Sequence, residues 1–305
     1  FVKIHRLIVN STNSLSIEPI DFHSLTLLVG VSGSGKSQVL HYIKELTQLL
    51  QTGQTKTLES GHYVLDFEYN EHLYTYEVTL DNYHIINQDL SSREGALSIP
   101  LQIKNINEKI RYVLPVSLIR QQQIKENSLN FLSDNTLERL AYIYQFQKER
   151  FDILKALYQL IFEEVEDLTF ETIENQYVLR LKDKSGATLT HHNLSDGMLK
   201  TLIYLSEVTL AKPGTVLLID EFENGLGLNC LGLILEEMIQ KQGIQMILTS
   251  HHPYIINNIT PSCWVIVHRI DSIVSNKTAI ELGIGQNKYD AFFELMNRLE
   301  YEGVF

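Results

Sequence analysis

Apolar residues recur with two different periods along this chain, and the period distinguishes strands from helices. Alternating apolar positions at 63–69 and 74–80, joined by a polar turn at 70–72, predict an antiparallel hairpin. Helical spacing over 137–161 predicts one long amphipathic helix or two in sequence. A second hairpin is expected on either side of the turn at 183–186.

Continuous apolar runs point to strands that are buried on both faces. They alternate with helical patterns in the second half of the chain, which indicates a parallel sheet. The expected buried strands are 25–29, 215–219, 244–248 and 264–268, and the expected helices begin at 37, 198, 228 and 288. Residues 113–120 fit a further strand, in which Pro115 suggests an edge or a bulge. The acidic run at 163–167 favours a solvated helix end over a metal site.

Composition excludes several classes of protein. The chain has 305 residues, 44% of them apolar and 20% charged, as in a globular protein of one large domain or two. It lacks the ~18-residue apolar run of a membrane span, and its start does not resemble a signal peptide. Two cysteines fit a reducing compartment, so we expect a cytoplasmic protein. The net charge of −12 argues against a broad nucleic-acid surface but leaves a local groove or an ATP site open.

The sequence GVSGSGKS at 30–37 fits the phosphate-binding pattern G-x-x-x-x-G-K-[ST] and lies between an expected strand and helix. Glycines let backbone N–H groups turn towards phosphates, and the helix N-terminus adds positive charge. Lys36 would reach the β- and γ-phosphates, and Ser37 would ligate Mg²⁺. The alternative is a Gly/Ser turn with an accidental lysine. The candidate contacts are Gly30, Ser32, Gly33, Ser34, Gly35, Lys36 and Ser37.

The strand ending in LLIDE places two carboxylates at its carboxyl end. Asp220 would hold Mg²⁺ through its water shell, and Glu221 would orient or deprotonate an attacking water. The pattern is weak alone and strong beside a phosphate loop.

Two shorter motifs add candidate residues. In NLSDGMLK, Ser195 and Gly197 stand at the start of a helix, where a second phosphate would bind. Because the chain's own phosphates already have a loop, this site makes sense if it faces the ATP of another subunit; the alternative is an ordinary N-cap. In TSHHPY, His251 follows a strand end and could bind the γ-phosphate, although a lone histidine is more often structural. His252 is expected to be structural.

In this order the motifs resemble those of the ABC-type ATPases, and within them the RecF/SMC-like branch. The closest resemblance is to compact AAA-type ATPases of bacterial phage-defence systems, over the N-terminal strands to Ser37 and then 193–258. It implies an α/β fold: an ABC-type P-loop NTPase with a mostly parallel core sheet. One such domain would span 1–305, with an antiparallel β subdomain at about 60–90 and a short helical insert at about 125–167.

The resemblance also implies a function. Two copies would close on two ATP molecules with Mg²⁺, hydrolyse them, and control a separate effector, a nuclease or toxin; the rate of turnover is left open. The family places a glutamine near Mg²⁺ and the water, for which we take Gln121; a polar glutamine loop is the alternative. It also assigns residues 223–226 to contacts with the opposite subunit. Ser32, Gly227–Leu228 and His252 depart from the family pattern without removing a phosphate or Mg²⁺ group.

Other functions remain open from the sequence. The chain could be a homodimer or a higher oligomer, and nucleic acid could bind directly or through a partner, whereas no membrane partner is expected. A DNA repair or chromosome-maintenance ATPase would clamp DNA itself, and a nucleotide-gated scaffold would turn over little. A transporter ATPase is the least favoured.

Overall fold

The computed structural model describes residues 1–92, 106, 108–126, 129–285 and 287–299. These residues divide into two compact units, which are treated separately below. Unit 1 consists of Phe1–Tyr112, Lys212–Glu223 and Gly243–Phe305, and unit 2 of Val113–Ala211 and Asn224–Gln242. The predicted single ATPase domain over 1–305 stays a prediction.

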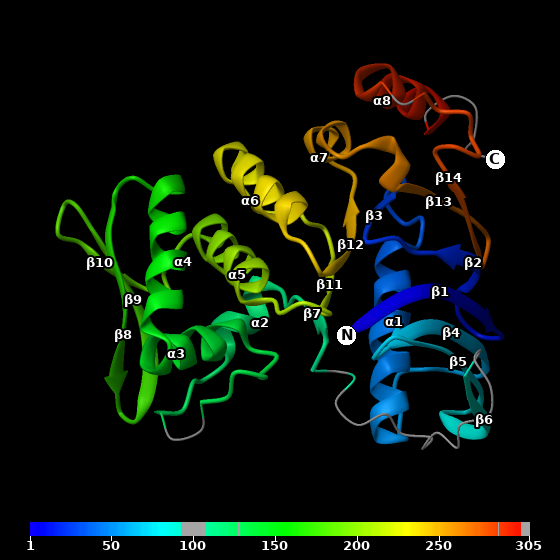
Figure 1. Cartoon of the computed structure of the whole chain (residues 1–305), viewed down its shortest axis with the longest axis horizontal. Coiled ribbons are helices and arrows are strands. Elements are labelled where there is room, and N and C mark those ends of the chain that lie inside the picture. Colours follow the sequence, from blue (N-terminus) through cyan, green and yellow to red (C-terminus); the bar gives the residue numbers. More distant parts are fainter. Residues whose placement is uncertain (93–105, 107, 127–128, 286, 300–305) are drawn as a thin grey trace. The chain divides into compact units, whose positions relative to one another are not determined.

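Unit 1 is built on an 11-stranded sheet with the order β6-β5-β4-β1-β2-β14-β13-β3-β12-β11-β7 (Figure 1). Its strands are β1 (Val2–Ser11), β2 (Ser16–Asp21), β3 (Leu25–Val29), β4 (Gly61–Tyr69), β5 (His72–Asp81), β6 (His84–Ser92), β7 (Ile110–Tyr112), β11 (Val216–Ile219), β12 (Gln245–Ser250), β13 (Trp264–Ile270) and β14 (Ile273–Thr278). The neighbours β7, β11, β12, β3 and β13 are parallel, whereas β2, β1, β4, β5 and β6 pair antiparallel. The expected mostly parallel core sheet is confirmed, and the antiparallel strands expected at about 60–90 continue the same sheet.

Helix α1 (Lys36–Thr52) packs its apolar face against this sheet. Val39, Ile43 and Leu46 belong to one buried cluster with Phe67 and Tyr76 of the antiparallel strands. This packing fixes the position of the first residues of α1 relative to the sheet. Unit 1 also contains α7 (Pro253–Asn258), a 3-10 turn (Pro261–Cys263) and α8 (Lys288–Asn297).

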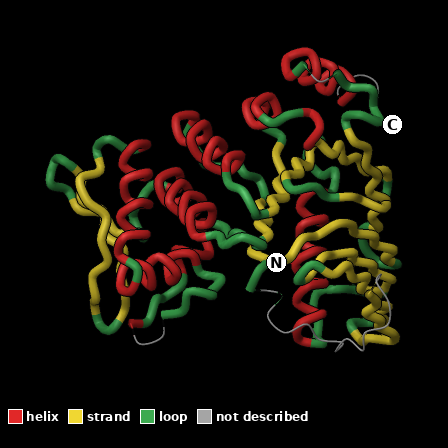
Figure 2. The backbone as a smooth tube through the Cα atoms, viewed as in Figure 1, coloured by secondary structure: helices red, strands yellow, loops and turns green. Residues whose placement is uncertain are grey.

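Unit 2 combines helices with a separate three-stranded antiparallel sheet (Figure 2). Its elements are α2 (Val116–Gln121), α3 (Thr136–Phe146), α4 (Lys148–Ile161), β8 (Val165–Ile173), β9 (Gln176–Asp183), β10 (Thr188–Thr190), α5 (Asp196–Leu210) and α6 (Leu228–Gln240). The carboxylate of Glu207 on α5 accepts hydrogen bonds of 2.6 Å from the Thr136 hydroxyl and from Arg139, both on α3. Glu207 and Arg139 are almost fully buried, so this ion pair joins two helices inside the core of unit 2.

Most predicted elements are present, including both hairpins, and the segment 137–161 is two helices. Gln147 separates them because its backbone is not helical (φ −141°, ψ 58°). Residues 127–128 of the predicted helical insert lie outside the described residues. No helix among the described residues is both long enough and apolar enough to cross a membrane.

Two predictions about local structure are wrong. Residues 113–120 do not form a strand, because β7 ends at Tyr112 and Pro115 caps the short helix α2. Proline suits this position, since its missing N–H costs nothing in a first helical turn. The acidic run is not a helix end: α4 stops at Ile161, and β8 begins at Val165.

Candidate functional site

The glycine-rich loop after β3 is shaped by close packing against the neighbouring strands. Gly35 caps α1 with φ 97°, and a Cβ there would lie 2.6 Å from Cγ2 of Val274. A Cβ on Gly30 would lie 2.3 Å from the carbonyl oxygen of Val267. Both positions therefore require glycine, and the loop is held in one conformation between β3 and α1.

Lys36, the first residue of α1, is buried within this loop. Its Nζ donates to the carbonyl oxygens of Gly30 (2.8 Å) and Val31 (2.9 Å). Burial lowers the pKa of the Lys36 amine, and the carboxylates of Asp220 and Glu223 oppose that shift. Nζ of Lys36 also donates to the Ser34 hydroxyl at 3.4 Å. A buried cation that has only neutral oxygen partners within this loop fits a site that receives negatively charged phosphate oxygens.

Three side chains that are distant in the sequence meet at the carboxyl ends of β11 and β12. Because these strands are parallel and adjacent, the residues that follow them lie at the same edge. Oδ1 of Asp220 accepts hydrogen bonds from the hydroxyls of Ser37 (2.9 Å) and Thr249 (2.6 Å). The Thr249 hydroxyl also accepts the N–H of Glu221 at 2.8 Å. A carboxylate and a serine hydroxyl in contact are hard oxygen donors, which suit Mg²⁺.

Sequence reasoning missed Thr249. The only signal was its place in the strand-end TSHHPY motif. The residue is fully buried, and its hydroxyl joins Asp220 to the backbone of Glu221. It therefore fixes the positions of both acidic residues.

Glu221 has a left-handed backbone with φ 45°, which is unusual for a residue other than glycine. Such backbone costs about 1–3 kcal/mol and concentrates at functional sites. The residue is exposed. The strained turn directs the chain away from β11 directly after the carboxylate pair.

His251 is held by a buried carboxylate. Oε1 of Glu223 accepts the backbone N–H of His251 at 3.0 Å and lies 3.1 Å from its ring Nδ1. The Glu223 side chain is 5% exposed and the His251 ring 63%, so one end of the ring is held and the other reaches solvent. His252 instead caps α7 through Nδ1, which confirms the expected structural role.

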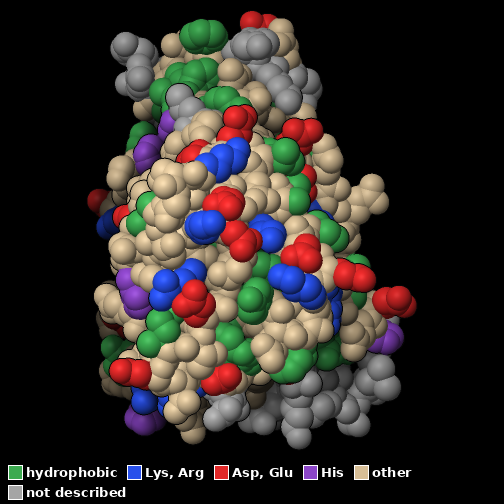
Figure 3. Space-filling model, turned by 90° about the vertical axis from the view of Figure 1, so that its left-hand side faces the viewer, with side chains coloured by type: hydrophobic (Ala, Val, Ile, Leu, Met, Phe, Trp, Pro, Cys, Tyr) green, Lys and Arg blue, Asp and Glu red, His purple; other side chains and the backbone are tan. Residues whose placement is uncertain are grey.

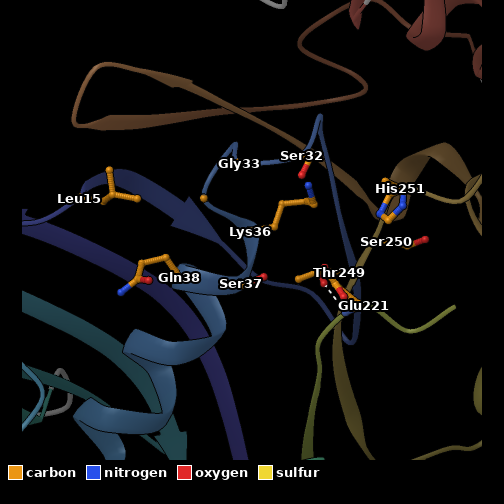
Figure 4. Close-up of a pocket in the computed structure, with 11 residues that line it drawn as sticks. Leu15, Ser32, Gly33, Lys36, Ser37, Gln38, Glu221, Thr249, Ser250 and His251 are labelled. Atoms are coloured by element: carbon orange, nitrogen blue, oxygen red, sulfur yellow. Dashed lines mark hydrogen bonds between the residues drawn. The ribbon is translucent and has the colours of Figure 1, made fainter. Parts of the chain in front are cut away.

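These groups surround a cavity of about 250 Å³ in unit 1 (Figure 4). The loop lies on one side of it and the end of β12 on the other. Its lining residues are Leu15, Ser32, Gly33, Gly35, Lys36, Ser37, Gln38, Glu221, Thr249, Ser250 and His251. The structure thus brings together most of the residues predicted from the phosphate loop, the acidic strand and the histidine motif.

A second cavity of about 420 Å³ shares Leu15 and Gln38 with the first. Hydroxyl-bearing residues of the β1–β2 turn line it, together with Arg269 and Ser272. No sequence motif pointed to this cavity, because its residues come from two turns without a recognisable pattern.

The remaining predicted residues, Ser195, Gly197 and Gln121, lie in unit 2. Ser195 is exposed, and its hydroxyl accepts the N–H of Met198 at 3.2 Å as the N-cap of α5. Ser195 therefore does cap α5, and the helix start is open to solvent; its binding of a partner's phosphate stays a prediction. Gln121 is the last residue of α2 and is exposed, so it lies at the end of a helix and not at the end of the predicted strand.

The loop before α5 contains a buried imidazole. Burial lowers the pKa of His191 to about 4, and the charges of His192 and Arg120 act in the same direction. The two histidine rings lie 3.9 Å apart between centroids. Nδ1 of His191 has no hydrogen-bond partner among the described residues. His191 is therefore neutral at physiological pH.

Comparison with known families matches residues 25–257 to the family described as "AAA domain, putative AbiEii toxin, Type IV TA system". The match covers well over half of the chain and runs from β3 beyond His251. The chain belongs to this family. A search of curated proteins found no match.

Three solved structures of Smc head domains share the fold of this AAA-family chain. It is similar to an Smc head bound to the C-terminal winged-helix domain of ScpA, with 14% identity and a TM-score of 0.61 over 90% of this chain and 97% of that one. It is also similar to the Smc head of Pyrococcus furiosus with an extended coiled coil, bound to the C-terminal domain of ScpA (11%, 0.57, 93% and 98%). The SMC head of Thermotoga maritima matches with 15% identity and a TM-score of 0.51 over 90% and 98%. The fold is therefore that of the Smc head domains.

Proposed function

We propose that this protein is an ATPase whose two copies close on two ATP molecules and thereby switch a partner effector protein. The observation that carries the proposal is the cavity of unit 1. It is lined by a glycine-rich loop, a buried lysine, the Glu221 carboxylate and His251 at adjacent strand ends, and Asp220 is hydrogen-bonded to its lining residue Ser37. Membership of the AAA family agrees with this chemistry.

The phosphates would lie in the smaller cavity, where Lys36 exchanges the carbonyls of Gly30 and Val31 for phosphate oxygens. Ser37 and Asp220 would hold Mg²⁺, which when bound neutralises charge on the phosphate oxygens. The nucleoside would extend into the adjoining cavity, towards Arg269. Both cavities belong to unit 1, so binding depends on this unit alone.

Hydrolysis would use Glu221 and His251. Glu221 lines the cavity and would orient the attacking water or accept its proton at the carboxylate. With Nδ1 of His251 beside Glu223, Nδ1 would donate to the Glu223 carboxylate, and a proton on Nε2 would be donated to a γ-phosphate oxygen. Asp220 and Thr249 hold the backbone that carries Glu221.

The second half of the site would come from the partner subunit. The start of α5 supplies unpaired backbone N–H groups and the positive end of the helix dipole, and Ser195 is exposed there. Ser195 and Gly197 of each copy would face the ATP of the other. Gln121 would approach Mg²⁺ and the water. Closure would then depend on bound ATP, and hydrolysis would reverse it.

Control of an effector rests on the family and on the neighbours. The family description names a toxin of a type IV toxin–antitoxin system, and two of the Smc heads are bound to a domain of ScpA. We infer that this protein likewise docks another chain, a nuclease or toxin, in cytoplasmic defence against phage. On the face in Figure 3, basic and acidic side chains alternate, which does not favour direct DNA binding there.

The experiment compares tagged Glu221→Gln and Lys36→Ala proteins, each purified from its native host with ATP present. We expect one effector to co-purify in stoichiometric amounts with only one of the two variants, either the ATP-bound Glu221→Gln protein or the nucleotide-free Lys36→Ala protein. Purified wild-type protein should hydrolyse ATP, and duplex DNA should not accelerate it. Strong, salt-sensitive stimulation by DNA would favour the repair ATPase, and stable effector binding with no turnover would favour the scaffold.

A further inference from the structure

One arginine holds the loop that leads into α5. Nη1 of Arg120 donates to the carbonyl oxygens of His191 (2.8 Å) and His192 (2.9 Å). Nη2 donates to the carbonyl oxygen of Leu194 and to Oδ1 of Asp196 (2.7 Å). A single guanidinium thus binds three backbone carbonyls and one carboxylate within six consecutive residues, all inside unit 2.

These contacts require the geometry of arginine. Three carbonyl oxygens that face the same small volume repel one another. A cation with several N–H donors between them removes this repulsion. The guanidinium has five N–H donors in a fixed fork, whereas a lysine ammonium is a compact charge on a flexible stem. The Arg120 side chain is only 20% exposed, whereas the Asp196 side chain is 76% exposed, so the guanidinium is largely shielded and its bond to Asp196 is open to solvent screening.

The opposite side of the same helix start is also fixed. Nζ of Lys200 donates to the carbonyl oxygen of Asn224, and a Cβ on Gly197 would lie 3.0 Å from the carbonyl oxygen of Gly225. The first turn of α5 therefore lies between the Arg120 contacts and the segment after the acidic strand. Arg120 directly precedes Gln121 in α2. The residue predicted to approach Mg²⁺ is therefore the chain neighbour of the arginine that holds the loop before α5.

We propose that Arg120 is a positioning residue: it presets the loop 191–196 so that the start of α5 can receive the nucleotide of a partner subunit, and it links that loop to Gln121. The inference rests on the proposed function, since it assumes that closed dimers form on ATP. In this proposal Arg120 acts by holding the loop 191–196 and is not itself a nucleotide contact.

The test compares Arg120→Ala and Arg120→Lys in the Glu221→Gln background, with Arg180→Ala as the matched control. Arg180 pairs with Glu171 on the small sheet of the same unit. Monomer affinity for ATP should stay within about twofold, because the phosphate loop is unchanged. The dissociation constant of the ATP-bound dimer, measured by analytical ultracentrifugation, should rise at least ~30-fold for Arg120→Ala and less for Arg120→Lys. Normal dimerisation of folded Arg120→Ala protein would overturn the proposal.

Hydrogen exchange separates this inference from the proposed function. Without nucleotide, amides of residues 191–198 should exchange faster in both Arg120 variants than in Arg180→Ala, while amides of α4 stay protected. If the Glu221→Gln parent itself fails to dimerise with ATP, the proposed function is wrong, and this exchange still decides whether Arg120 orders the loop. Unchanged exchange at 191–198 would overturn the role of Arg120. If Arg120→Ala does not fold, Arg120→Lys carries both measurements.

Discussion

The two units build their candidate binding surfaces in different ways. In unit 1, Lys36, Asp220 and Thr249 come from distant parts of the sequence and meet because parallel strands end at one edge. In unit 2, the surface is one contiguous stretch at the start of α5, and the distant residue Arg120 holds the loop that leads into it. Charged side chains define the first surface, and backbone N–H groups define the second. The first should bind nucleotide alone, and the second should matter only when two copies meet.

The largest expected effect is a loss of ATP binding in unit 1 that leaves the structure of unit 2 unchanged. Lys36→Ala should weaken ATP binding by ~10³-fold, because it removes a buried cation that makes charge-assisted hydrogen bonds. Isothermal titration calorimetry measures this. Hydrogen exchange in α3 and α5 should remain as in the wild type. Retained affinity would mean that the loop does not hold the phosphates.

The next effect isolates the start of α5. Ser195→Arg should lower kcat by ~10²-fold with little change in ATP affinity, because a long side chain would block the approach of a partner's nucleotide. Ser195→Ala is the control: it removes only the cap and should cost about 1 kcal/mol of stability. Wild-type turnover in Ser195→Arg would leave Ser195 with its capping role alone.

An effect of acid is expected in unit 2 through His191. Its folded pKa of about 4 lies below the ordinary value of 6.5, so the unfolded state binds more protons. Stability is therefore complete above pH 6.5 and falls as the pH drops towards 4; at pH 5 the loss reaches about 2 kcal/mol. Urea unfolding of the wild type and of His191→Gln at pH 7 and pH 5 measures it. Equal losses in both proteins would contradict the assignment.

The smallest effect concerns the held end of His251. Glu223→Gln keeps an acceptor for the His251 N–H but removes the charge beside Nδ1. We expect kcat to fall by ~10-fold while ATP affinity stays within about threefold. Glu236→Gln, on the exposed face of α6, is the matched control. A variant with unchanged kcat would show that Glu223 supports only the backbone.

The parallel core strands of unit 1 and its candidate site residues could be proposed from the sequence alone. Each of them lies in a short local motif that is tied to one backbone conformation or to burial. Gly35 needs a left-handed backbone, and the run ending at Asp220 is a buried strand. The contact between Thr249 and Asp220 could not be predicted in the same way, since it depends on which strands are neighbours.

The wrong predictions concern segments whose local sequence pattern fits two different secondary structures. The segment 113–120 has enough apolar residues for a strand, yet Pro115 starts a helix there. Arg120 was overlooked because its four acceptors lie more than seventy residues along the chain, and three of them are backbone carbonyls, which no sequence pattern identifies.

Association on ATP is the central claim, and the mass of Glu221→Gln protein in solution tests it most directly. Multi-angle light scattering should give the monomer mass without nucleotide and twice that mass with Mg·ATP, and Ser195→Arg in the same background should restore the monomer. A monomer of Glu221→Gln protein at saturating ATP would contradict the account.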